Sequence, residues 1–200
     1  MIIAVDKAQK EGKHDIKHNQ LIKLGHELWF LPLPVGDYIL VDDAVREVIK
    51  RRGDKLKKMD LLGCCQRSVD TKYGMAEAYQ CLIGPSHNRF RDECILAQQN
   101  GIDLYILVES APEVKCLEDV KNWQPWERLY AYCRRNKIKT GQGMMARIED
   151  YVAHGGQKPP VGGEQLYKAM RTSAMEHGYR WAFCKPEDTG KSIAYLLTKE

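Results

Sequence analysis

The chain lacks any long apolar run, and no stretch approaches the roughly 20 apolar residues that a membrane span requires. We therefore expect no membrane partner. Its seven cysteines form no Cys-x-x-Cys pair and no zinc-ligand spacing, which argues against a metal cluster held by thiolates. The short apolar run at residues 2–5 has no basic flank, unlike a secretion signal. An odd number of cysteines without such a signal predicts reduced thiols in a cytoplasmic protein.

Signatures of other enzyme classes are missing or incomplete. The sequence contains no Gly-x-Ser-x-Gly elbow and no Cys/His pair at a recognisable spacing, so nucleophilic hydrolases are unsupported. Gly190-Lys191-Ser192 matches the end of a phosphate-binding P-loop, but Lys185 stands where the first glycine of that loop belongs. A P-loop-like nucleotide-binding protein is therefore a less favoured alternative.

The patterns that are present predict an α/β protein. With 200 residues and 44% apolar composition, the chain suits a single domain spanning residues 1–200, with helical insertions at about 42–66 and 111–160. Apolar and polar periodicity predicts strands at 2–5, 27–33, 38–41, 66–72, 104–109 and 179–184, and helices at 12–24, 42–52, 73–83, 87–99, 164–176 and 189–197. This order indicates an α/β sandwich with a mixed sheet. We expect the aromatic residues of the second insertion to pack a small satellite core.

Two acidic motifs suggest a metal-dependent phosphodiester chemistry. Asp70 and Lys72 are two apart on a predicted strand and should face the same way. Asp37 follows Gly36 in a turn that ends another strand, where its carboxylate would lie in an open site. Two carboxylates from different strands suit Mg²⁺ or Mn²⁺, which lowers the pKa of a bound water. Asp37, Asp70 and Lys72 are the predicted catalytic residues, with Lys72 orienting or deprotonating the water or neutralising the transition state.

Basic residues suggest where a nucleic acid would bind, although a formal charge of +4 is too small to establish such a partner. Six cations occur within residues 50–58, and a phosphate-facing surface and a solvated helix face are equally good interpretations of them. The predicted DNA-binding residues are Lys13, His14, Lys50, Arg51, Arg52, His87, Arg89 and Arg91.

Four motifs together resemble a known family. They are Leu-Pro-Val-Gly-Asp-Tyr at 33–38, Val-Asp-Thr-Lys at 69–72, His-Asn-Arg-Phe-Arg-Asp-Glu at 87–93 and Leu-Val-Glu at 107–109. They are similar to the nuclease domain of the XPF type, within the PD-(D/E)XK superfamily, and most of all to its stand-alone versions in phages and bacterial mobile elements. The resemblance implies a restriction-endonuclease-like three-layer α/β/α sandwich. It also implies Mg²⁺-dependent cleavage of branched, flapped or fork DNA, as in DNA repair or recombination.

The resemblance extends to individual residues. Asp37 matches the acid of the family's Gly-Asp motif, Asp70 its metal-binding acid and Lys72 its catalytic lysine. Thr71 stands where the family has an arginine, which predicts a changed phosphate contact.

Further acids and the partners follow from the same resemblance. Asp6 matches the acid of the first strand, Glu77 lies one position beyond the helix acid, and Arg89 matches the arginine after the second helix break. The implied metal ligands are therefore Asp37, Asp70, Asp6 and Glu77. The implied partner is DNA, and a homodimer is left open. The main alternative is a catalytically silent protein that binds DNA or another partner on a nuclease fold.

Overall fold

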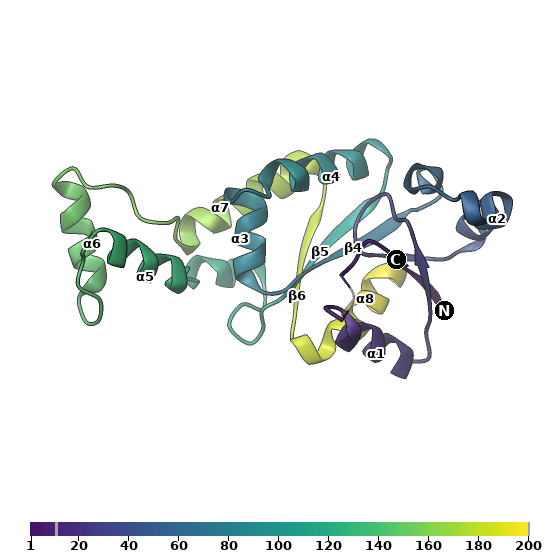
Figure 1. Cartoon of the computed structure of the whole chain (residues 1–200), viewed down its shortest axis with the longest axis horizontal. Coiled ribbons are helices and arrows are strands. Elements are labelled where there is room, and N and C mark those ends of the chain that lie inside the picture. The colour runs from purple at the N-terminus through teal and green to yellow at the C-terminus, as the bar shows by residue number, and fades with distance from the viewer. Residues whose placement is uncertain (11, 200) are drawn as a thin grey trace.

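The computed structural model describes residues 1–10 and 12–199, and its centre is a six-stranded mixed sheet (Figure 1). The strands are β1 (Ile2–Asp6), β2 (Glu27–Leu31), β3 (Tyr38–Leu40), β4 (Arg67–Lys72), β5 (Asp103–Glu109) and β6 (Arg180–Cys184). Their order across the sheet is β2-β1-β3-β4-β5-β6. The short β3 runs antiparallel to both of its neighbours, whereas the other pairs are parallel. The predicted mixed sheet is confirmed.

Helices cover both faces of this sheet. The α-helices are α1 (Asp15–Lys23), α2 (Asp43–Arg52), α3 (Met75–Ile83), α4 (His87–Gln99), α5 (Trp126–Arg135), α6 (Met144–Ala153), α7 (Gly163–His177) and α8 (Thr189–Thr198). Short 3₁₀ helices lie at η1 (Gly53–Lys55), η2 (Lys58–Leu61), η3 (Leu117–Asn122) and η4 (Pro186–Asp188). The helices expected outside the second insertion all form, with ends shifted by a few residues at most.

Alternating side chains of the strands build two cores. On one face, Ala4, Ile39 and Ile106 pack against the layer of α3, α4 and α7. On the other face, Val5 and Leu107 pack against the layer of α1 and α8, together with the other members of that core. The period of two along each strand thus produces the predicted three-layer α/β/α sandwich.

The strand directions bring several acids to one edge of the sheet. Since β3 is antiparallel to β1 and β4, the carboxyl ends of β1, β4 and β5 meet the amino end of β3 at the same edge. Asp6, Asp70, Glu109 and Asp37 lie at or next to these strand ends. The topology alone therefore gathers carboxylates that are far apart in the sequence.

Both predicted insertions are helical. Residues 42–66 contain α2, η1 and η2, and the Asp42 side chain caps α2 by accepting a hydrogen bond from the Val45 N–H at 2.9 Å. Within residues 111–160, α5 and α6 project away from the sheet (Figure 1). They share a small core formed by Leu129, Tyr132, Cys133, Met144 and Ile148. Of the aromatic residues expected to fill it, Trp126 and Tyr130 are exposed, and Trp123 packs against a core of the sandwich instead. Across the described ranges 1–10 and 12–199, no helix has the length and apolar character needed to cross a membrane.

Replacing Gly163 with alanine tests how the second insertion is attached to the sandwich. A Cβ at Gly163, the first residue of α7, would lie 2.3 Å from the carbonyl oxygens of Val120 and Trp123 in and after η3. Overpacking against backbone atoms cannot be relieved by a rotamer change, so we expect Gly163→Ala to lower the free energy of unfolding by about 1–3 kcal/mol. Urea unfolding measures the change. Gly162→Ala is the matched control, because its Cβ would meet only the flexible Gln124 side chain, at 3.2 Å. Equal stability of both variants and the wild type would contradict this packing.

Candidate active site

A cleft of about 710 Å³ opens at the edge of the sheet where the strand ends meet. Eight of the predicted site residues line it: Asp6, Lys13, His14, Asp37, Asp70, Lys72, Glu77 and Arg89. Lys10, Lys17, Lys58 and Glu93 line the same cleft and were not predicted as site residues. The cleft therefore combines the expected carboxylates with a larger set of cations than the motifs indicated.

The turn before β3 is fixed tightly against β4. Gly36 has a φ of 67°, and a Cβ there would lie 2.2 Å from the Ser68 Oγ. The Gly36 N–H donates to Glu93 Oε1 at 2.8 Å, and the Asp37 N–H donates to the Val69 carbonyl oxygen at 2.9 Å. Glycine is required here both for its left-handed conformation and for the close approach to β4. This turn sets the position of the Asp37 carboxylate.

Thr71 holds the Asp37 carboxylate in place. Asp37 Oδ2 accepts hydrogen bonds from the Thr71 backbone N–H at 2.9 Å and from Thr71 Oγ1 at 2.6 Å. The same hydroxyl accepts a hydrogen bond from Lys17 Nζ at 3.0 Å, and Lys17 Nζ lies 2.5 Å from Glu109 Oε1 in a buried ion pair. A continuous polar chain thus runs from the end of β5 through α1 and β4 to Asp37.

Asp70 and Lys72 form a second buried pair on β4. Lys72 Nζ donates to Asp70 Oδ2 at 2.5 Å, and each residue is 6% exposed. Burial raises the pKa of Asp70 to about 7; Lys72 opposes this shift, and the nearby Asp37 and Glu93 add to it. Although burial alone would lower the pKa of Lys72, the Asp70 carboxylate raises it, so the ammonium group stays charged.

The carboxylates fit a hard divalent cation held by few protein ligands. Asp37 and Asp70 line one cleft. Burial is the main cause of the raised pKa of Asp70 and the nearby Asp37 adds to it, so a bound cation would favour the charged carboxylate. Within the part of the chain that the structure describes, no group of three or more His, Cys, Asp or Glu side chains is arranged to hold a metal. Mg²⁺ commonly binds through one or two carboxylates and keeps several waters. Asp37 and Asp70 therefore suit such an ion.

The two outer acids lie in the cleft but are engaged by the backbone. Asp6 Oδ1 accepts hydrogen bonds from the N–H groups of Ala8 and Leu33, both at 3.3 Å. Glu77 Oε2 accepts from the Tyr73 N–H at 2.7 Å, and its other oxygen lies 4.0 Å from Lys13 Nζ. Each contact orders a segment at the cleft, and a metal-binding role of these acids stays a prediction.

The predicted DNA-binding residues divide into two groups. Arg89, Lys13 and His14 line the cleft, and burial lowers the pKa of His14, which favours the neutral imidazole. Five others are exposed and lie outside the cleft lining: His87, Arg91, Lys50, Arg51 and Arg52. Of these, Arg52 pairs with Asp60 at 2.6 Å, at the end of the molecule that carries α2 (Figure 1). From this insertion it is Lys58 that reaches the cleft.

Three residues of the site had weak signals in the sequence. Lys17 lies four positions before Leu21 on the inward face of α1, so a lysine on an apolar helix face was the available signal. Glu93 similarly follows Phe90 by three positions in α4 and shares its inward side. Glu109 ends a strongly apolar strand, as Asp6 does. The sequence alone does not place these three residues in the site, because their contacts depend on how the helices pack against the sheet.

The segment that resembles a P-loop has a structural role. Gly190 lies in the first turn of α8, and its N–H donates to Gln20 Oε1 at 2.6 Å. A Cβ at Gly190 would lie 2.6 Å from the Gln20 Cβ, so the glycine permits the close packing of α8 on α1. Because this N–H is already bonded to α1, the local geometry does not favour phosphate binding.

Substitution of Thr71 tests the polar chain that positions Asp37. Thr71→Val keeps the volume but removes the hydroxyl, leaving Lys17 and Asp37 each with one partner fewer in a buried site. We expect it to lower the free energy of unfolding by about 1–3 kcal/mol, while Thr71→Ser, which keeps the hydroxyl, loses clearly less. Chemical denaturation of the three proteins measures this. No loss in Thr71→Val, or a larger loss in Thr71→Ser than in Thr71→Val, would contradict the hydrogen-bonded role.

The raised pKa of Asp70 predicts how the free energy of unfolding changes with pH when a chelator removes divalent ions. Between its ordinary value of 3.8 and about 7, folded Asp70 holds a proton that the unfolded chain has lost. Its contribution to stability is therefore complete below pH 3.8 and is lost as the pH rises through 7. Relative to Asp70→Asn, the free energy of unfolding of the wild type should therefore fall as the pH rises through this range. Unfolding at several pH values measures it, and a pH-independent difference would show that Lys72 fully offsets burial.

Comparison with known proteins adds no assignment for this cleft. A search of protein-family models and a search of curated proteins find no match to the chain. The resemblance to XPF-type nuclease domains therefore stays a prediction from four sequence motifs, and the contacts of the cleft are the basis for a functional proposal.

Proposed function

We propose that this protein is a metal-dependent DNA endonuclease that hydrolyses phosphodiester bonds. The observation that carries the proposal is the meeting of Asp37 with the Asp70–Lys72 pair in one cleft, at the edge of the sheet where the ends of four adjacent strands meet. Two carboxylates and a buried lysine supply both parts that this hydrolysis needs, a site for a hard cation and a fixed positive charge.

Each residue has a role that follows from its contacts. Bound by Asp37 and Asp70, Mg²⁺ or Mn²⁺ would supply a water of lowered pKa and offset charge on the phosphate. Thr71 orients Asp37 through two hydrogen bonds to one carboxylate oxygen. Lys72 keeps its charge beside Asp70, which suits neutralising a phosphorane-like transition state better than accepting a proton from water.

The cations around the carboxylates support a polyanionic substrate. Lys10, Lys13, Lys58 and Arg89 are exposed side chains in the cleft lining, and they come from three separate segments: the connection between β1 and α1, η2, and α4. Such a ring can hold a backbone phosphate on each side of the scissile bond. The preference for DNA, and for flapped, forked or branched forms of it, comes from the sequence resemblance.

A catalytically silent DNA-binding protein is the second candidate. It shares the cations of the cleft but needs neither Asp70 nor Lys72. A buried charged pair is costly to maintain, because each charge loses its hydration and must be offset by its partner. Retention of this pair beside Asp37 therefore favours an enzyme.

A cleavage panel tests the proposal. The substrates are single-stranded, duplex, flap, fork and four-way DNA, each with Mg²⁺, Mn²⁺ or chelator. We expect metal-dependent cutting of at least one substrate, reduced on the order of 100-fold or more by Asp70→Asn and by Lys72→Met. Asp150→Asn, on the exposed surface of α6, is the control for loss of one carboxylate outside the cleft.

The outcomes separate the two candidates. Cleavage that survives Asp70→Asn would refute the site assignment, even if the protein is a nuclease. Tight binding of DNA without cutting under any metal condition would support the silent binding protein instead.

A further inference from the structure

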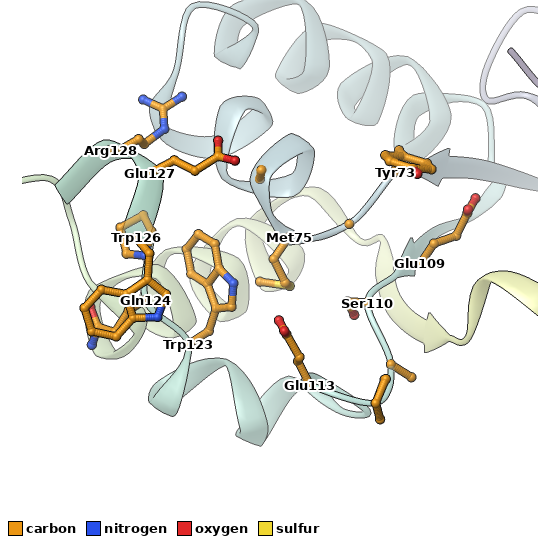
Figure 2. A pocket seen from close by; sticks show the side chains of 15 residues that line it. Tyr73, Met75, Glu109, Ser110, Glu113, Trp123, Gln124, Trp126, Glu127 and Arg128 are labelled. Carbon is orange, nitrogen blue, oxygen red and sulfur yellow. The ribbon is translucent and has the colours of Figure 1, made fainter. Parts of the chain in front are cut away.

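A second pocket, of about 460 Å³, lies beside the cleft. One wall is formed by the residues that follow β4 and end β5, including Tyr73 and Glu109, and the other by the segment that joins η3 to α5, including Trp123 and Trp126. Figure 2 shows the two tryptophans on the side opposite Tyr73 and Glu109, with Met75 between them. The second insertion thus supplies half of this pocket.

The pocket and the cleft share a boundary. Tyr73 directly follows Lys72, is 73% exposed and lines both spaces. Glu109 lines the pocket while Lys17, its partner in the ion pair, lines the cleft. A polymer whose phosphate sits beside Lys72 therefore has its neighbouring unit within reach of the pocket.

The chemistry of the pocket differs from that of the cleft. Its lining combines the rings of Trp123, Trp126 and Tyr73 with the carboxylates of Glu113 and Glu127, the guanidinium of Arg128, and Glu109, whose carboxylate is paired with Lys17. Carboxylates disfavour a phosphate but accept hydrogen bonds from the amino groups of nucleobases. Indole and phenol rings offer faces on which a base can stack. Arg128 lies over the Tyr79 ring at the edge of the pocket, whereas Lys10, Lys13, Lys58 and Arg89 line the cleft. The pocket therefore suits the base and the cleft the phosphate of a nucleotide.

We propose that this pocket takes one unstacked nucleobase from the DNA strand whose phosphate lies in the cleft. The inference rests on the proposed function and extends it, because it names the part of the substrate that the protein reads. A base leaves its helix at least cost where it is already unpaired. The pocket would thereby favour single-stranded, flapped or gapped DNA over intact duplex.

Binding without divalent ions tests the pocket separately from cleavage. The probes are a short single-stranded oligodeoxynucleotide and the same sugar–phosphate chain made abasic throughout. We expect Trp126→Ala to weaken binding of the intact strand by about 5- to 100-fold and to leave binding of the abasic chain unchanged. Trp126 is 49% exposed, so its loss spares the core, and Trp126→Phe should retain most of the affinity. Tyr195→Ala, at an exposed aromatic on α8, is the matched control and should change neither affinity.

Several results would overturn the inference. The wild type could bind the two probes with equal affinity, or Trp126→Ala could lose the same affinity for both probes. Alternatively, Trp126→Ala could lose no affinity for the intact strand, or the wild type could bind neither probe. Either of the last two results would indicate that the pocket binds something other than a nucleobase, such as an apolar side chain of a protein. Metal-dependent cleavage with base-independent binding would refute this inference alone, whereas base-dependent binding without cleavage would refute the proposed function alone.

Discussion

The candidate site depends on the pairing of β3 with β4. β3 has three residues, and its first residue, Tyr38, pairs with Val69, which places Asp37 beside the end of β4. A slip of one residue would turn every side chain of this short strand to the opposite face. Gly36 prevents such a slip, because its backbone touches β4 where no side chain would fit. The distance along the chain between Asp37 and Asp70 is thus bridged by backbone hydrogen bonds, while Thr71 and Lys72 orient the two carboxylates.

Two buried ion pairs support the site from opposite faces of the sheet. Asp70 and Lys72 lie on the side of α3 and α4, whereas Lys17 and Glu109 join α1 to the end of β5. Thr71 lies between them and links the second pair to Asp37. At the position where the resembling family has an arginine, this chain therefore has a neutral hydroxyl, and the cation next to it comes from α1. Loss of a single partner from a buried pair is strongly destabilising, since the remaining charge would be uncompensated.

Features that depend on residues close together in the sequence could be predicted, whereas those that depend on contacts between distant elements could not. Strands and helices follow from periodicity, and Asp37, Asp70 and Lys72 follow from short motifs whose spacing fixes their faces. Lys17 and Glu93 were not predicted, because their role depends on how α1 and α4 are rotated against the sheet. The basic run at Lys50–Arg52 shows the reverse case. Its charge is plain in the sequence, yet local composition does not tell on which side of the molecule a helix will lie.

The separate core of α5 and α6 has a consequence for how such a protein evolves. Leu129, Tyr132, Cys133, Met144 and Ile148 pack among themselves and share no member with the cores on the two faces of the sheet. Energetic coupling between residues that make no contact is usually small. Sequence changes on the exposed surface of α5 and α6 can therefore reshape this end of the molecule while the strand ends keep their arrangement.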